Sequence, residues 1–209
     1  REYRFKTDFF IDKTGNLAIK GWGDPYLISE EIVLVTQALR AKGIKTVQRI
    51  FIDHSSYVSG ITIPGASRSL NPHVATKFVA LMRTGGIEVK SDEYAETVVD
   101  SEWTLIYTHR NSRDLLTVSQ GLQKHSNNFI ANQIFLTIGA EKLGYPATME
   151  KSRTIFEGYI HAKMGIQEGA LILTEGSGLS RETKVTGNVM IYILERFRDQ
   201  AEVLPEKKG

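Results

Sequence analysis

The segment Thr174-Glu175-Gly176-Ser177-Gly178-Leu179-Ser180-Arg181 stands out in the sequence. It follows the short apolar segment 171–173, which predicts a strand. Glycines and serines directly after a strand predict a tight turn that exposes backbone groups, because glycine adopts conformations closed to other residues. The glycine spacing differs from the G-x-S-x-G elbow of hydrolases. On this pattern alone, a structural turn that could line a cleft is a better interpretation than a nucleophile.

A second polar segment, Ser126-Asn127-Asn128, lies between two predicted helices. In an extended approach to the second helix, the side chains of Ser126 and Asn128 point to the same side. A hydroxyl beside a carboxamide can relay a proton and hold a carbonyl group. Serine and asparagine are also preferred at helix N-termini, so the pattern alone favours a helix cap.

The third segment is Gly21-Trp22-Gly23-Asp24-Pro25. Gly-x-Gly alone is a weak signal for a phosphate-binding loop, and no G-x-x-x-x-G-K-[ST] follows it. We interpret the segment as a turn that ends a strand.

Strands are predicted early in the chain and helices later, which indicates an α+β (mixed α/β) fold. Residues 1–70 form the first predicted segment, with a hairpin, a helix and a strand, and residues 71–209 form a mainly helical second segment. The predicted elements are a hairpin over 4–21 with its turn at 12–16, a helix from Ser29 to Gly43, a strand over 46–53, a long loop over 55–70, a helix from Pro72 capped by Asn71, a strand over 102–108, and helices that begin at Ser112, near Asn127 or Asn128, at Thr148 and after Thr186.

Composition excludes several classes of function. The 209 residues include 26 basic and 24 acidic side chains, which alternate along the chain without a basic stripe, so a nucleic-acid partner is not expected. The chain has no cysteine, which excludes disulfides and thiolate chemistry and fits a cytosolic or an envelope protein. The five histidines form no H-x-x-x-H pair, so a metal site is not supported. No cofactor is expected. No apolar run reaches the length of a membrane span, and the first residues lack the apolar region of a signal peptide.

Taken in order, these segments resemble one family, the D-Ala-D-Ala carboxypeptidase/endopeptidases of the penicillin-binding protein 4 type. The resemblance rests on the strand and Gly-Asp-Pro turn over 17–27, on Asp53-x-Ser55, on the helix start Ser126-x-Asn128, and on residues 175–181 followed by Val185-Thr186. It covers nearly the whole chain except roughly 57–99.

The resemblance implies part of a penicillin-binding, β-lactamase-like transpeptidase fold and a serine acyl-transfer enzyme of the periplasm or another extracytoplasmic compartment. It implies peptidoglycan stem peptides as substrates and β-lactams as ligands. Ser126 would join the proton relay to the leaving amine, and Asn128 would hold the peptide amide. The cleft would be lined by Ser177, Gly178, Leu179 and Ser180.

The sequence departs from the family pattern at two motifs. No serine is followed three residues later by lysine, so the S-x-x-K nucleophile motif is missing from these 209 residues. K-T-G occurs at Lys13-Thr14-Gly15, in the predicted hairpin turn, where we interpret it as a coincidence. By family order, S-x-x-K would lie before Arg1 and K-T-G after Gly209, and an inserted module is shortened around 57–71. We therefore expect a partial copy that is inactive alone, with its oligomeric state open.

Two other hypotheses remain. A non-catalytic envelope protein would keep the cleft and bind peptidoglycan or a partner. An unrelated domain with chance matches would place Ser126 and Ser177 far apart, whereas the family resemblance predicts that both segments lie near one cleft.

Overall fold

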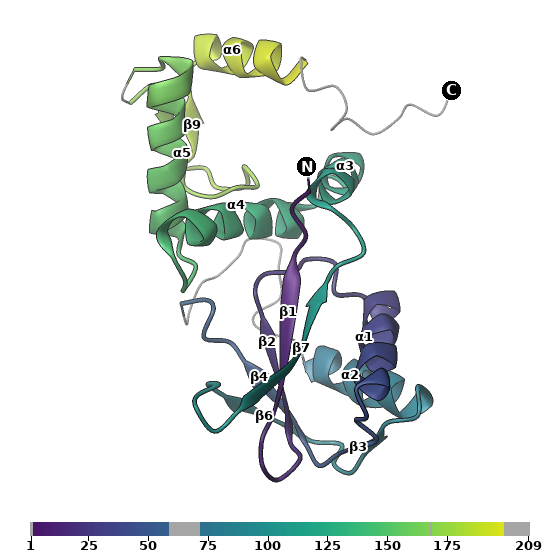
Figure 1. The fold of residues 1–209 in the computed structure, drawn as a ribbon. Helices are drawn as coiled ribbons and strands as arrows, with labels where there is room; N and C mark the ends of the chain where they lie inside the picture. The colour runs from purple at the N-terminus through teal and green to yellow at the C-terminus, as the bar shows by residue number, and fades with distance from the viewer. Residues whose placement is uncertain (1, 59–71, 168, 199–209) are drawn as a thin grey trace, which may run out of the picture. The chain divides into compact units, whose positions relative to one another are not determined.

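The computed structural model describes residues 2–58, 72–167 and 169–198 (Figure 1). Contacts divide the described chain into two compact units. Among the described residues, the first unit comprises 3–58 and 72–113, and the second comprises Glu2 and the residues from Asp114 onward. The boundary that we predicted at residue 70 lies outside the described residues, so the two-segment division stays a prediction.

The first unit is built on a mixed five-stranded sheet. The hairpin strands β1(Lys6–Ile11) and β2(Leu17–Gly21) pair antiparallel with Phe9 opposite Ile19, and β7(Thr104–Arg110) continues the antiparallel pairing on the other side of β1. On the far side of β2, β4(Ile50–Asp53) and β6(Tyr94–Thr97) follow in parallel, and such connections need crossover segments. The strand order is β6-β4-β2-β1-β7.

Two helices, α1(Ser29–Ala41) and α2(Pro72–Thr84), supply the crossovers and lie on the same side of the sheet (Figure 1). Their apolar faces pack with the inward side chains of the central strands into one core. A small parallel pair, β3(Thr46–Val47) and β5(Glu88–Val89), extends it. The largest fully buried members of this core are Phe9, Leu17, Ile32, Leu39, Ile50, Ile52, Phe78, Met82 and Ile87.

The second unit is mainly helical. Its helices α4(Asn128–Leu143) and α5(Met149–Met164) pack closely because Gly139 carries no side chain. A Cβ atom there would lie 2.4 Å from the Ser152 hydroxyl and 2.6 Å from its backbone nitrogen. Phe135 and Phe156 fill the same interface, with ring centroids 5.0 Å apart. The elements of this unit are α3(Leu115–His125), α4(Asn128–Leu143), α5(Met149–Met164), β8(Leu171–Ile172), β9(Lys184–Val185) and α6(Gly187–Arg198).

The α+β class predicted from the sequence is confirmed, with differences in detail. The strand predicted over 46–53 is two strands, β3 and β4, that belong to different sheets. The short strands β5 and β6 were not predicted. The cap predicted at Ser112 is wrong, because Asp114 caps α3 by accepting the Thr117 backbone N–H at 2.9 Å. Most of the loop predicted over 55–70, and the predicted cap Asn71, lie outside the described residues.

Candidate active site

The Ser126-Asn127-Asn128 segment connects α3 to α4 within the second unit. Ser126 follows α3 with φ 48° and ψ 49°, in the left-handed region, and Asn127 is extended. Asn128 is the first residue of α4. The extended approach to the helix that we predicted from the sequence is therefore wrong at Ser126.

The left-handed turn at Ser126 is the point where α3 ends. The backbone N–H groups of Ser126 and Asn127 both donate to the Leu122 carbonyl, a common way to end a helix, and the residue in this turn is usually glycine. A side chain in this region costs roughly 1–2 kcal/mol. Ser126 is the one non-glycine residue with positive φ in the part of the chain that the structure describes. Backbone strain of this kind clusters at functional sites.

Asn127 performs the capping that the pattern predicted for this segment. Its side chain accepts the Ile130 backbone N–H at 3.1 Å. The side chains of Ser126 and Asn128 make no hydrogen bond with any other described residue. Ser126 is exposed and Asn128 is half-buried. Capping thus uses Asn127 and leaves one hydroxyl and one carboxamide available to another molecule.

The loop after β8 is organised around the Glu175 carboxylate, which is buried. This carboxylate accepts the Ser177 backbone N–H at 2.7 Å, the Ser180 backbone N–H at 3.3 Å and the Ser177 hydroxyl. Burial alone would raise the pKa of Glu175, but these hydrogen bonds and the Asn132 side chain outweigh it, so the pKa is lowered. The loop is therefore held around a carboxylate that stays ionised.

The same loop packs against α4. The Gly176 N–H donates to Oδ1 of Asn132 at 2.7 Å. A Cβ atom on Gly176 would lie 2.6 Å from Cβ of Phe135 and 2.8 Å from the Ala131 carbonyl oxygen, so the close approach requires glycine. Asn128 and Asn132 are four residues apart on α4 and share one face of the helix. The loop thus contacts the helical face on which Asn128 lies.

All four predicted cleft residues, Ser177, Gly178, Leu179 and Ser180, lie in this loop. The tight turn predicted there is confirmed, with Gly178 at φ +77°. Ser177 and Ser180 are half-buried and bind Glu175, while Leu179 is 52% exposed. The hydroxyl of Ser177 donates to a carboxylate and has no histidine or lysine partner among the described residues, which does not favour a nucleophile. The roles of these residues in lining a cleft stay a prediction.

The Lys13-Thr14-Gly15 tripeptide lies in the turn between β1 and β2, in the first unit. Lys13 is largely exposed and pairs with Glu102 at 2.9 Å. Asp12 holds the turn by accepting the Thr14 backbone N–H at 2.9 Å. This geometry is typical of a surface turn and supports the interpretation of this K-T-G as a coincidence.

Two further motifs that support the resemblance, the Gly-Asp-Pro turn and Asp53-x-Ser55, stabilise the first unit through hydrogen bonds. Asp24 accepts both the Tyr26 backbone N–H at 2.8 Å and the Asn111 side-chain amide at 2.9 Å, which ties the Gly-Asp-Pro turn to the end of β7. Asp53 accepts the Ser55 backbone N–H at 2.7 Å and pairs with Lys20 at 3.1 Å. Burial raises the pKa of Asp24, whereas at Asp53 hydrogen bonds overcome burial and lower the pKa.

Sequence reasoning missed a buried polar cluster around Glu31. Its carboxylate accepts Nε2 of His109 at 2.7 Å, the Ser112 backbone N–H at 3.1 Å and the Ser112 hydroxyl. Glu31 and His109 are 1% and 3% exposed, so this is a desolvated ion pair or hydrogen bond. The signal that could have found it is the glutamate beside the apolar stripe of the predicted helix. Because Ser112 and His109 both bind the carboxylate, their arrangement is not that of a serine activated by histidine.

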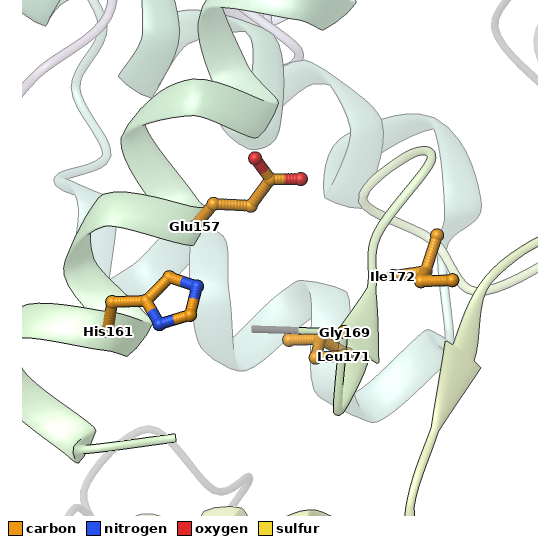
Figure 2. Close-up of a pocket in the computed structure, with 5 residues that line it drawn as sticks. All are labelled: Glu157, His161, Gly169, Leu171 and Ile172. Atoms are coloured by element: carbon orange, nitrogen blue, oxygen red, sulfur yellow. The ribbon is translucent and has the colours of Figure 1, made fainter. Parts of the chain in front are cut away.

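An open hollow of about 550 Å³ lies beside α5. Figure 2 shows Glu157 and His161, one turn apart on α5, opposite Leu171 and Ile172 of β8. A carboxylate, an imidazole and aliphatic side chains line this hollow together with Gly169. The lining includes no serine and none of the predicted site residues, so we treat it as separate from the candidate active site.

The described residues contain no group of three or more His, Asp or Glu side chains that could hold a metal ion. In the same part of the chain, every helix is too short or too polar to cross a bilayer.

Solved structures define the class of fold. Penicillin binding protein 4 (dacB) from Haemophilus influenzae, crystallised with a β-lactam, superposes with a TM-score of 0.74 at 17% identity, over 98% of this chain and 67% of that chain. The Bd0816 predatory endopeptidase from Bdellovibrio bacteriovorus, in complex with immunity protein Bd3460, gives 0.57 at 16% identity, over 96% of this chain and 59% of that chain. The fold is thus that of penicillin-binding protein 4, and the chain spans about two thirds of the length of the H. influenzae protein.

The sequence identifies the family. It matches the family described as D-Ala-D-Ala carboxypeptidase 3 (S13) over residues 1–69 and 58–205. The chain belongs to this family, and the hypothesis of an unrelated domain with chance matches is wrong.

Proposed function

We propose that this chain is part of a serine-type D-Ala-D-Ala carboxypeptidase/endopeptidase that acts on peptidoglycan stem peptides. The observation that carries the proposal is the segment Ser126-x-Asn128 at the start of α4. The side chains of Ser126 and Asn128 make no hydrogen bond to described residues. The Glu175–Ser180 loop packs against the same helix. Family membership supports the same reaction.

The proposed chemistry is acyl transfer through an enzyme-bound ester. A serine hydroxyl attacks the carbonyl carbon of the penultimate D-alanine, and the bond from this carbon to the leaving nitrogen breaks. Ser126 relays a proton to that nitrogen, and Asn128 donates its amide N–H to the substrate peptide. Water then hydrolyses the ester and restores the serine. Ser177, Gly178, Leu179 and Ser180 line the cleft on the side of the loop.

The nucleophile of this reaction is not among these 209 residues, because no S-x-x-K occurs in them. We therefore propose that the chain is a partial copy that is inactive alone, and that β-lactams bind when the nucleophile is present. A periplasmic or other extracytoplasmic location of the cell envelope follows from the proposed substrate.

The missing S-x-x-K also favours a second candidate function. A protein that keeps Ser126, Asn128 and the loop without a nucleophile would bind peptidoglycan stems, or a partner protein, without cleaving them. The complete reading frame that contains this sequence distinguishes the two proposals, because an S-x-x-K helix in it predicts an enzyme.

In the product of that complete reading frame, Ser126→Ala should slow acylation by a fluorescent penicillin about 10²–10³-fold, because removal of a positioned proton-transfer group has effects of this size. Asn128→Ala should act in the same direction. The measurement is the rate of fluorescent labelling against penicillin concentration.

Ser101→Ala is the control, because Ser101 is an exposed serine in a turn of the first unit. It should label at the wild-type rate. An unchanged rate in Ser126→Ala would contradict the assigned role. A product that retains purified peptidoglycan but is never labelled would support the binding function in place of the enzyme.

A further inference from the structure

Asn132 is a buried polar residue in a mainly apolar helix face. It lies on α4, one turn after Asn128, and is 0% exposed. Its Oδ1 accepts the Gly176 N–H at 2.7 Å. Its Nδ2 has no hydrogen bond of normal geometry within the described chain. The residue therefore makes one strong contact, and this contact is with the loop.

Burying a carboxamide with an unpaired N–H carries a desolvation penalty. An aliphatic side chain of similar size would avoid that penalty in the helix, but it would leave the Gly176 N–H without an acceptor. The hydrogen bond to the loop, and not the packing of α4, therefore explains why a polar residue occupies this position. The Asn132 side chain also helps to lower the pKa of the Glu175 carboxyl, although its Nδ2 forms no hydrogen bond of normal geometry with that carboxylate.

Hydrogen bonds to one residue hold the loop together. The Glu175 carboxylate accepts the backbone N–H groups of Ser177 and Ser180, so both residues are tied to it. Gly176 touches α4 without room for a side chain, since a Cβ atom would lie 2.6 Å from Cβ of Phe135. One hydrogen bond to Asn132 and one glycine contact therefore determine where the whole loop lies on the helix.

We propose that Asn132 is a positioning residue, which fixes the loop 175–180 at the helical face that carries Asn128. This inference rests on the proposed function, because it concerns the same site. Asn132 does not touch the substrate. It sets the distance between the two sides of the cleft, and a displacement of about 1 Å at such a site can cost on the order of 10²-fold in rate.

The first experiment uses the 209-residue chain and needs no activity. Hydrogen exchange of the Gly176 amide is followed by NMR in the wild type, in Asn132→Leu and in the matched control Thr137→Val. Thr137 is also buried on α4, but its hydroxyl donates to the Gln133 carbonyl of the same helix. Asn132→Leu should speed exchange at Gly176 at least tenfold, and Thr137→Val should leave it unchanged.

The second experiment measures acylation by the fluorescent penicillin in the product of the complete reading frame. Asn132→Leu should reduce the labelling rate about tenfold, with the circular dichroism of the helices unchanged and Thr137→Val labelled as the wild type. If Asn132→Leu does not fold, Gly176→Ala provides a second variant, because its methyl group displaces the loop from α4. It should also speed amide exchange at position 176 and slow acylation.

The outcomes separate the two proposals. Faster exchange at Gly176 together with slower acylation supports the positioning role. Unchanged acylation in Asn132→Leu and Gly176→Ala, while Ser126→Ala slows labelling as predicted, overturns this inference and leaves the proposed function intact. Unchanged acylation in all of these variants, Ser126→Ala included, overturns both.

Discussion

Glu31→Ala should lower the free energy of unfolding of the first unit by about 3–5 kcal/mol, because removing one partner of a buried ionic group leaves the other partners uncompensated. Glu31 is 1% exposed and holds His109 and Ser112 together at the end of β7. After the substitution, His109 stays buried without its acceptor. Urea denaturation at pH 7, followed by the signal of the first unit, measures the change.

The neighbouring Glu30 provides the control. It lies in the same first turn of α1 but is exposed, so Glu30→Ala should cost about 1 kcal/mol or less, mainly through the helix dipole. Equal effects of Glu30→Ala and Glu31→Ala would contradict the role assigned to the buried cluster.

The effect of Glu31 should also depend on pH. Burial alone would raise the pKa of Glu31, but hydrogen bonds from Ser112 and His109 lower it below its ordinary value of about 4.3. The stabilisation is therefore fully present above that value and is lost as the pH falls through the lower folded pKa. The difference between the wild type and Glu31→Gln should shrink below about pH 4. A difference that grows on acidification would contradict the assigned direction.

Gly139→Ala should destabilise the second unit by about 2–3 kcal/mol, which is a cost typical of overpacking a closed interface. The new methyl group would lie 2.4–2.7 Å from three atoms of Ser152, and two of these are backbone atoms that cannot rotate away. The two helices would have to separate, which loosens the contact between Phe135 and Phe156. Thermal or urea denaturation of the second unit measures the effect.

Gly158→Ala is the matched control for this substitution. Gly158 lies on the exposed side of α5, and a Cβ atom there meets nothing within 4 Å. Alanine is the better helix former, so this variant should gain about 0.5–1 kcal/mol. The two glycine variants should thus change stability in opposite directions, and a change of the same sign in both would contradict the packing described for α4 and α5.

Local sequence signals predicted the parts of the fold that short segments determine. The hairpin followed from the alternation around Phe9 and the turn at 12–16, and the starts of α5 and α6 followed from Thr148 and Thr186, whose hydroxyls accept backbone N–H groups at 3.1 and 3.4 Å. The division of residues 46–53 between two sheets was not predictable, because it depends on pairing with β5 and β6 far along the chain.

The candidate site shows the same limit. The sequence singled out Ser126 and Asn128, but it could not show that Asn127 takes the capping role and leaves them without partners. The role of Asn132 could not be predicted, since a lone asparagine in a helix forms no recognisable pattern. That role depends on a hydrogen bond with Gly176, 44 residues later, which only the folded chain shows.

We propose that this chain carries the Ser126-x-Asn128 part of an acyl-transfer site and not its nucleophile. Intact-mass spectrometry of the 209-residue chain after incubation with benzylpenicillin tests this directly. We predict no covalent adduct on the chain, and one adduct per molecule on the product of the complete reading frame, at a serine outside these residues. A stoichiometric penicilloyl adduct on any serine of the 209-residue chain would show that the nucleophile lies within it and would contradict this proposal.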